Sequence, residues 1–517
     1  MAPARDAAHT AHTTRVSMAI TPALAIALAL AVALAGAALG IAHALRPASV
    51  LGDSPLLEDA FYALAVARHA ALGHGLTADG VLPCNGFQPL WVFLNVPLYA
   101  LTRGDRVLTL RYTLALATTV WIAFGVCVAR AAARRVQPPD APLARALGPC
   151  VTLGSYAVFR AFHNGLETGV LLVLLALAVE RLDDPARRAT PGTALVLAAL
   201  VYARLDAALF VLAATALSIT RDDRSPSGLA PLAPLASCAF AALALVPWLA
   251  RNVRLDGHPV PTSGRAEALH IDLGRNAVAT LAAVGQWTLA PFVRLPLWAP
   301  AAQVAGATAG VIAGVLFVRS RPSLRAQPTG TAALWVHLAG LAGYYTLAFG
   351  APHFQDRYLA PALLVTLAPL AAAAARSPRR AAALALAVAL ANLPFLTCSL
   401  AGAGTLGGTT YNRQTAWVLA RVQPECTVGA GQSGALGYFR DRVVNLDGKV
   451  NARALAAIRA HALRAYLDSA GVDVVIDWPV YIRGILGEAP SGFVRWGSAG
   501  RFDVWVRTGR EGCVRPG

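Results

Sequence analysis

Two adjacent carboxylates, Glu58 and Asp59, stand shortly after the first long apolar stretch of the chain. Neighbouring carboxylates can divide two tasks: one removes a proton from an attacking group, and the other orients a partner or helps to hold a divalent cation, Mg or Mn. The alternative is structural, because acidic residues suit the first turn of a helix, and Asp59 could cap a helix that runs to Leu72. The residue types leave both interpretations open.

Two further polar segments could line a pocket beside these carboxylates. In the segment from Asn85 to Trp91, the side chains of Asn85, Gln88 and Trp91 could form one wall. A plain loop anchored at the membrane surface is the alternative, since Asn-Gly indicates a turn and aromatic residues suit the interface. In the segment that starts at His163, Glu167 opens an apolar run. A carboxylate there is costly and indicates function, although pairing with the helix dipole is the structural alternative.

The elements that must position these residues are membrane helices. Of 517 residues, 56% are hydrophobic and only 14% are charged, whereas a soluble domain carries roughly 25% charged residues. Many apolar runs reach about 18 residues, which is long enough to cross a bilayer as helix. The net charge of +17 is nearly all arginine, and the arginines cluster between apolar runs, where they set topology and meet anionic headgroups. Nucleic acid is therefore disfavoured as a partner.

The topology follows from the arginine clusters. The first apolar run, 17–45, exceeds the core of a cleaved signal peptide, which is the competing interpretation. We expect an uncleaved anchor with residues 1–16 in the cytoplasm. If the short apolar stretch 88–102 lies flat at the outer interface, the later arginine clusters all fall on the cytoplasmic side, as the positive-inside rule requires. The sequence therefore predicts an interfacial helix at 88–102.

The apolar runs predict a transmembrane domain at 17–402 with about eleven spans and a first outer loop at 46–107. The runs 192–204 and 206–220 could form one long span, but its central Arg and Asp would cost roughly 2.5–3.5 kcal/mol each. A re-entry at the outer face places this charged pair near water instead. The remaining spans are expected at 108–129, 143–160, 166–181, 229–250, 301–318, 331–350, 357–375 and 381–401, and 251–300 is expected to be an outer loop.

Four arginines, Arg204, Arg251, Arg254 and Arg357, fall on the outer side in this topology. Outer arginines oppose the usual bias, so they need another role. Forked guanidinium donors bind phosphate well, and a lipid-phosphate headgroup in this leaflet would suit them. The alternative is a local ion pair with a neighbouring aspartate, Asp206 for Arg204 or Asp356 for Arg357.

The polar tail, 403–517, is predicted to be a small extracytoplasmic α/β domain. Strands are expected at 426–430, 472–478 and 502–506, and an amphipathic helix at 451–470 opened by Asn451. The seven cysteines show no metal-binding spacing. In an extracytoplasmic domain Cys426 and Cys513 could form a disulfide, and two unpaired thiols are the alternative.

The sequence has no phosphate-binding loop of the Walker type, no dinucleotide-binding glycine turn and no zinc-protease motif. A nucleotide site is therefore unsupported. A transferase that acts outside the cytoplasm cannot easily use nucleotide sugars, and would draw on a sugar already attached to a lipid carrier.

The first outer loop resembles that of the GT-C fold glycosyltransferases, which include protein O-mannosyltransferases and aminoarabinose transferases. The resemblance lies in the order of an acidic pair with aromatics (58–62), Gly-His-Gly (73–75) and Asn-Gly-Phe-Gln-Pro-Leu-Trp (85–91). Segments at 164–168, 203–206, 434–438 and 445–448 are similar to later family segments, so the resemblance spans most of the chain.

The resemblance implies a polyprenyl-phosphate sugar donor, an outer-face active site, inversion at the anomeric carbon and a catalytic carboxylate that maps onto Glu58 or Asp59. Many relatives carry Asp at the first position, where this chain has Glu58. We therefore expect a multi-pass hexosyl- or pentosyltransferase of a bacterial cytoplasmic membrane, acting on a lipid, glycan or protein acceptor. Its sugar or acceptor pocket is expected to use Tyr62, His74, Asn85, Gln88, Trp91, His163 and Glu167.

Two other classes compete with this interpretation. A transporter or flippase would place charges near the bilayer midplane and pair broken helices in two halves, whereas the carboxylates here lie at the outer edge and no inverted repeat is evident. A non-catalytic scaffold with the same fold differs from the enzyme only in activity.

Overall fold

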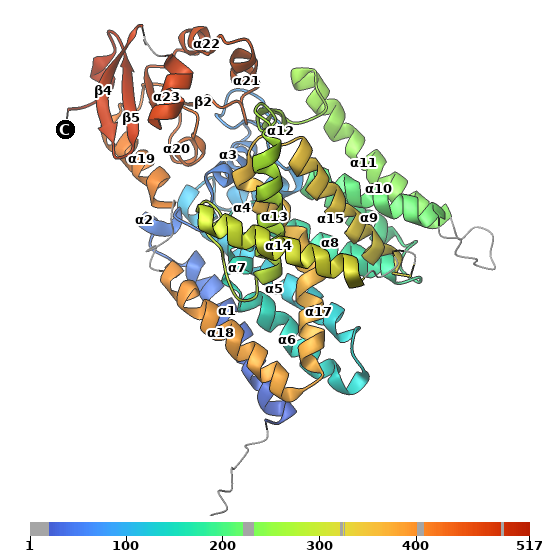
Figure 1. The fold of residues 1–517 in the computed structure, drawn as a ribbon. Coiled ribbons are helices and arrows are strands. Elements are labelled where there is room, and N and C mark those ends of the chain that lie inside the picture. Colours follow the sequence, from blue (N-terminus) through green and yellow to red (C-terminus); the bar gives the residue numbers. More distant parts are fainter. Residues whose placement is uncertain are drawn as a thin grey trace, which may run out of the picture.

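The structure, a computed structural model, describes residues 20–220, 232–320, 324, 326–400, 408–487 and 491–516. The predicted cytoplasmic segment 1–16 and the predicted domain boundary at 402 lie outside these residues. The described chain forms a large helical body and a smaller domain that contains a sheet (Figure 1). The N-terminal end of α1 (Pro22–Ala44) and the sheet domain lie at opposite ends of the body (Figure 1).

The helical body consists of long apolar helices joined by short turns. Its longer helices after α1 are α3 (Glu58–Ala71), α4 (Pro89–Leu101), α5 (Arg106–Ala133), α6 (Ala141–Leu153), α7 (Tyr156–Phe162), α8 (Thr168–Asp183), α9 (Pro191–Ala203), α10 (Ala208–Thr220), α11 (Leu232–Asp256), α13 (Leu273–Leu289), α14 (Pro300–Ser320), α15 (Thr329–Leu347), α17 (Leu363–Ala375) and α18 (Pro378–Leu400). Its short elements are α2 (Ala48–Leu51), η1 (Pro138–Asp140), η2 (Leu205–Ala207), α12 (Thr262–Ala266), η3 (Pro352–Phe354), α16 (Gln355–Tyr358) and η4 (Ala360–Ala362).

Among the described residues, five helical segments are long and apolar enough to cross a membrane. They are Pro22–Ala44, Arg106–Ala133, Leu235–Asp256, Pro352–Ala375 and Pro378–Cys398, and four shorter apolar helices accompany them. The chain is thus the polytopic helical membrane protein that its composition predicts. The count of about eleven spans and the direction in which the chain crosses the membrane stay predictions.

The structure corrects two of the predicted runs. The single helix expected at 143–160 is broken after Leu153, because the Ser155 hydroxyl caps α7 by accepting from the Val158 amide and itself donates to the carbonyl of Ala290. The expected outer loop 251–300 contains the 17-residue helix α13, whose first turn is capped by the Asp272 carboxylate. This aspartate is the start signal that the sequence interpretation overlooked.

Helices α13 and α14 pack with their backbones in contact, and glycine makes this possible. A Cβ atom on Gly285 would lie 1.9 Å from the carbonyl oxygen of Gly306, and one on Gly310 would lie 2.1 Å from that of Leu281. Small residues at a helix crossing allow this close approach. The two helices therefore form one rigid pair at the side of the body.

Gly285→Ala is expected to lower the melting temperature in detergent, because the added methyl group must push α13 and α14 apart. Overpacking of this kind costs about 1–3 kcal/mol. Gly314→Ala on α14 is the matched control, since its Cβ would meet no atom within 4 Å and alanine favours helix over glycine by about 1 kcal/mol. Equal melting temperatures of the two variants would contradict the close packing.

The C-terminal domain is built on a five-stranded mixed sheet in the order β2-β1-β3-β5-β4. Strands β1 (Val428–Ala430), β2 (Val443–Asn445) and β3 (Val474–Asp477) are parallel, and β5 (Phe502–Arg507) and β4 (Phe493–Ala499) are antiparallel. The α/β domain predicted for the tail is therefore present. Its helices are α19 (Gly408–Arg421), α20 (Gly434–Phe439), α21 (Ala452–Arg459), α22 (Leu463–Ser469), α23 (Pro479–Leu486) and η5 (Glu511–Cys513).

Two details of this domain bear on the predictions. The helix expected at 451–470 opens at Asn451, whose side chain accepts from the Ala454 amide, but it splits into α21 and α22 where His461 adopts a left-handed conformation. Cys426 and Cys513 form a disulfide that ties the end of the chain to the start of the domain. The domain packs on the helical body through α20, which lies against α3.

Candidate active site

A cavity of about 430 Å³ lies at the base of the C-terminal domain, and we call it the central cavity. Asp59 of α3 and Lys449 of the C-terminal domain line it, and so does Leu212 of α10. Leu212 is 65% exposed on an apolar helix, so the cavity reaches the lateral surface of the body. Its other polar and aromatic lining residues are Tyr62, Phe87, Gln88, Trp91, Glu167, Arg204, Asp206, Ser263, Glu267, Tyr344, Tyr345, Phe349, Arg357 and Tyr358.

Asp59 is the centre of a chain of ion pairs in this cavity. Its Oδ2 accepts from Arg357 Nη1 at 2.8 Å, and its Oδ1 accepts from Lys449 Nζ at 3.2 Å. Lys449 Nζ also lies 2.9 Å from Glu267 Oε1. Burial alone would raise the pKa of Asp59, but the two cations outweigh it and hold the pKa well below its usual range. The aspartate is therefore ionised, and each of its oxygens is held by a cation.

Lys449 reaches the cavity on a turn that follows β2 in the C-terminal domain. Its carbonyl oxygen accepts from the hydroxyl of Thr262, 2.7 Å away. Asn85 Oδ1 in turn accepts from the backbone amide and the hydroxyl of Thr262. A Cβ atom on Gly86 would lie 1.7 Å from the Lys449 carbonyl oxygen, so only glycine allows the turn to come this close. The Asn-Gly pair thus joins the first outer loop to the turn that carries Lys449.

Glu58 points away from the central cavity. Helix α3 begins at Glu58, so the residue at its N-cap position is Leu57 and not Asp59. The capping role considered for Asp59 is therefore wrong, although both carboxylates lie in the first turn of the helix. Glu58 Oε1 accepts from the Ala435 amide at the start of α20. Burial raises the pKa of Glu58 to about 8, and the negative charge of Asp59 adds to this. Glu58 is therefore a neutral contact between the helical body and the C-terminal domain at neutral pH.

Tyr62, one turn after Glu58, strengthens the same contact. Its hydroxyl donates to the carbonyl of Gly431 and accepts from Asn445 Nδ2, both at 3.2 Å. Burial raises its pKa well above the usual value, so the hydroxyl keeps its proton. Tyr62 lines the central cavity as expected, and it also ties α3 to the sheet domain.

Glu58→Gln is expected to make the protein less sensitive to high pH. The folded protein keeps the Glu58 proton up to a pKa of about 8, whereas the ordinary pKa of a glutamate is 4.5. Between pH 4.5 and about pH 8 the folded state therefore binds more protons than the unfolded state. The contribution of Glu58 to the free energy of unfolding is fully present below pH 4.5 and is lost as the pH rises to about 8. Over this range the free energy of unfolding falls by at most about 1.4 kcal/mol per pH unit because of Glu58.

The measurement is the drop in melting temperature between about pH 6 and about pH 8.5. The glutamine variant should show the smaller drop, because its side chain is neutral throughout. All other titrating groups are common to both proteins. Equal drops would contradict a protonated Glu58.

The other residues predicted for the pocket divide into two groups. Gln88, Trp91 and Glu167 line the central cavity, and the Trp91 indole donates to the Gly165 carbonyl at 2.8 Å. Asn85 does not line it, because its side chain is engaged with Thr262 as described above.

The two predicted histidines lie elsewhere. His163 is fully buried, stacks on Phe159 and lies 2.9 Å from the hydroxyl of Thr118. His74 is exposed at the end of α3. Neither lines the central cavity, so the pocket prediction is wrong for both. Histidine is common as a packed core residue and at helix ends, and its type alone could not separate these roles.

The predicted phosphate-binding arginines also divide. Arg204 is 2% exposed, and its Nε donates to both carboxylate oxygens of Asp206 at 2.8 and 3.0 Å, so the local ion pair considered as the alternative is present. Arg357 pairs with Asp59, and its expected alternative partner Asp356 binds Arg294 at 2.6 Å. Arg204 and Arg357 line the central cavity.

The remaining two arginines do not line this cavity. Arg251 donates to the Cys84 carbonyl and lies over the Trp248 ring, and Arg254 is exposed. Nothing in their positions connects them with a headgroup bound beside Asp59.

The sequence interpretation missed Lys449 and Glu267. One signal for Lys449 was available, because it is the only lysine in a chain rich in arginine and follows the family-like segment 445–448. Glu267 gave no signal. It is one acidic residue in a segment expected to be a loop, and only the tertiary fold brings it to Lys449.

The two neighbouring carboxylates do not fit a shared divalent-cation site. The Glu58 and Asp59 side chains face different parts of the structure, and both oxygens of Asp59 are already bound by protein cations. Within the described ranges, one group of three potential ligands comes together, Cys426, Asp473 and Cys513, and its two cysteines are joined in a disulfide. No step below involves a metal ion.

The overall fold is similar to that of a solved structure. ArnT from Cupriavidus metallidurans bound to undecaprenyl phosphate superposes with a TM-score of 0.57 at 12% sequence identity, over 93% of this chain and 97% of that chain. The archaeal oligosaccharyltransferase AglB from Archaeoglobus fulgidus aligns with 87% of this chain at 14% identity, but its TM-score of 0.40 supports no argument. No family model and no curated protein sequence matches the chain. The chain therefore has the GT-C fold.

Proposed function

We propose that this GT-C fold protein is a membrane glycosyltransferase that moves a sugar from a polyprenyl phosphate to an acceptor hydroxyl at the outer face of the membrane. The observation that carries the proposal is the position of Asp59. It is an ionised carboxylate beside two cations, in a cavity that is also lined by apolar side chains, among them the exposed Leu212. A reaction between a lipid-linked donor and a polar acceptor needs this combination.

The apolar part of the central cavity suits a polyprenyl chain. Leu209 and Leu212 of α10 line it together with Gly340 and Tyr344 of α15. Leu212 and Tyr344 are 65% and 46% exposed, so a chain in this groove would continue into the lipid. The solved neighbour with the same fold carries undecaprenyl phosphate, and this supports the choice of carrier.

Arg357 and Lys449 are the proposed partners of the carrier phosphate. Cationic donors stabilise a phosphate that gains charge as the bond to the sugar breaks. Both cations now bind Asp59, so an entering phosphate would share them. This would weaken their hold on the carboxylate and raise its pKa toward the ordinary range, which makes Asp59 a better base. Donor binding would thereby prepare the catalytic group.

The proposed reaction is a single displacement. The acceptor oxygen attacks the anomeric carbon, Asp59 takes the hydroxyl proton, and the carbon–oxygen bond to the phosphate breaks with its electron pair going to the leaving polyprenyl phosphate. One displacement inverts the anomeric carbon. Gln88 and Glu167, with the rings of Trp91 and Tyr358, are placed to bind sugar hydroxyls and faces beside Asp59.

The test uses purified protein in lipid nanodiscs, a panel of labelled polyprenyl-phosphate hexoses and pentoses, and a crude envelope extract as acceptor. We expect release of free polyprenyl phosphate that depends on one class of sugar and on the extract. If well-folded protein releases no polyprenyl phosphate with any donor of the panel, the proposal is contradicted. That result would favour a transporter or a scaffold.

A further inference from the structure

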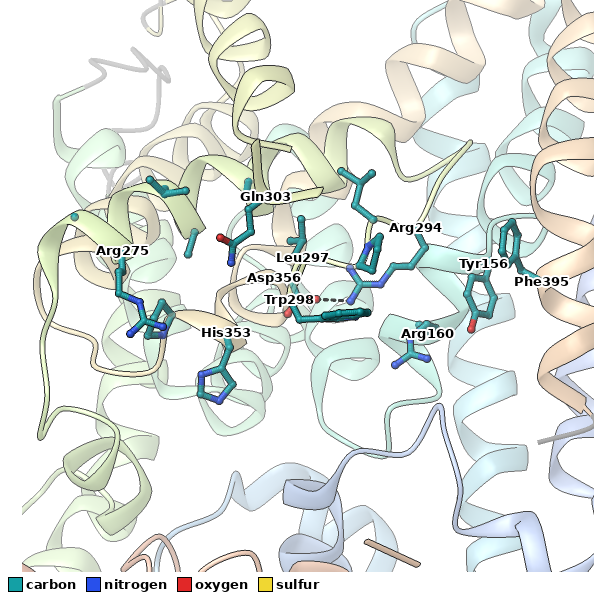
Figure 2. Close-up of a pocket in the computed structure, with 17 residues that line it drawn as sticks. Tyr156, Arg160, Arg275, Arg294, Leu297, Trp298, Gln303, His353, Asp356 and Phe395 are labelled. Carbon is teal, nitrogen blue, oxygen red and sulfur yellow. Dashed lines mark hydrogen bonds and ion pairs between the residues drawn. The ribbon is translucent and has the colours of Figure 1, made fainter. Parts of the chain in front are cut away.

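A second and larger cavity, of about 860 Å³, lies beside the α13–α14 pair. We call it the arginine cavity. Figure 2 shows Arg160 and Arg294 on one side of it and Arg275 with His353 on the other. None of these residues belongs to the central cavity.

The polar lining of the arginine cavity carries excess positive charge. Arg160, Arg275 and Arg294 line it, and Asp356 is the one carboxylate among its lining residues. Asp356 binds Arg294 through Nη2, whereas Arg294 Nη1 is buried and has no hydrogen-bond partner within the described part of the chain. An unpaired buried guanidinium nitrogen is costly unless a ligand satisfies it. Forked donors of this kind match the oxygens of a phosphate group.

The lining also has an apolar part with two exposed rings. Trp298 is 65% exposed and Phe395 is 59% exposed, and the side chains of Val278 and Leu297 continue the wall. Phe395 belongs to α18, one of the helices long and apolar enough to cross a membrane. A ligand that fills this cavity would place a charged group against the arginines and an apolar part against these rings, which is the chemistry of an anionic lipid.

A smaller cavity of about 180 Å³ lies next to the arginine cavity, with which it shares the lining residues Arg160, Arg294 and Asp356. Arg357 also lines this smaller cavity and is the lining residue that it shares with the central cavity. Arg357 holds Asp59 at 2.8 Å. The arginine cavity therefore lies close to the Asp59–Arg357 pair.

We propose that the arginine cavity binds the phosphate-bearing headgroup of a second membrane lipid. The role of this lipid as the acceptor rests on the proposed function, whereas the existence of a lipid-phosphate site in the arginine cavity does not. The acceptor class is then an anionic phospholipid or glycolipid, and not a protein.

The test is native mass spectrometry of the full chain in neutral detergent, titrated with phosphatidic acid. Diacylglycerol serves as the neutral lipid and glycerol 3-phosphate as the soluble phosphate.

The variants remove arginines from the cavity. Arg275→Gln removes one exposed arginine, and the double variant Arg275→Gln/Arg294→Gln removes two arginines. We expect phosphatidic acid to bind the double variant at least about ten-fold and the single variant about three-fold more weakly than wild type. Arg254→Gln, an exposed arginine outside both cavities, should leave the affinity unchanged.

Two further arms separate the possible sources and sites. Equal affinity for diacylglycerol and phosphatidic acid, or no loss in either arginine variant, would overturn the proposal. Equal affinity for glycerol 3-phosphate would overturn its lipid part. Asp59→Asn and Lys449→Met alter the central cavity and should leave this binding unchanged. If no donor sugar is transferred but the arginine-dependent binding remains, the proposed function fails and the lipid site stands.

Discussion

Asp59→Asn is expected to reduce sugar transfer by about 10²- to 10⁴-fold, the usual contribution of a general base. Asparagine has the size of aspartate but cannot accept the acceptor proton. The substitution also leaves Arg357 and Lys449 beside a neutral amide in place of a carboxylate. Lys449 keeps Glu267 as a partner, so we expect the protein to insert and to remain folded. The measurement is the rate of polyprenyl phosphate release with the donor of the panel that supports transfer by the wild type.

Glu58→Gln is the matched control for this prediction. It changes the adjacent carboxyl group to the amide of the same size, in a side chain that is neutral at pH 7 because its pKa is about 8. We expect it to keep most of the activity. Retained activity in both variants would remove the first-loop carboxylates from catalysis, and an inactive Glu58→Gln beside an active Asp59→Asn would exchange their roles.

The membrane character and the C-terminal α/β domain could be predicted because they depend on local patterns. Apolar runs, the arginine clusters between them and Asn451 as a helix start are each visible within a short window of sequence. The errors arise where a local pattern competes with packing. The run 143–160 is mostly apolar and predicts one span, although Gly154 and Ser155 are a stop and a start signal within it. The break at these residues is held by a hydrogen bond from Ser155 to Ala290, far along the chain.

The division of roles within the acidic pair could not be read from the sequence. Neighbouring residues of a helix point about 100° apart, so Glu58 and Asp59 must face different surroundings. Which one faces the cavity depends on how α3 packs against α20. The same reason explains the wrong partner for Arg357: Asp356 is next to it in sequence but pairs with Arg294, and Arg357 turns to Asp59.

Sequence proximity brought the first-loop residues into the predicted site, and whether they act there stays a prediction. They lie close together in the sequence and carry a family-like pattern. Lys449 is separated from Asp59 by 390 residues, and only the folded structure shows that the C-terminal domain supplies a charged group to the first loop. The role of this domain was the question that the sequence left open.

Lys449→Met is expected to slow sugar transfer by about 10²-fold, because removal of one charged donor from a site of developing charge costs about this much. Methionine keeps the length and much of the apolar volume of the lysine stem. The loss of the charge has a second consequence. Lys449 is the largest of the influences that lower the pKa of Asp59 against the effect of burial, so this pKa should rise in the variant.

A general base is active in its ionised form, and the acid limb of the pH–rate profile reports its pKa. A higher pKa therefore moves the acid limb of the Lys449→Met variant to higher pH, whereas a purely structural role of Lys449 would lower the rate at every pH alike. Arg453→Met is the control, since Arg453 is an exposed cation of the same domain and should change neither the rate nor the profile. Lys449→Arg should restore part of the rate and return the acid limb toward lower pH. An unshifted acid limb in Lys449→Met would show that the C-terminal domain does not act on Asp59, and would leave Arg357 as the cation that controls it.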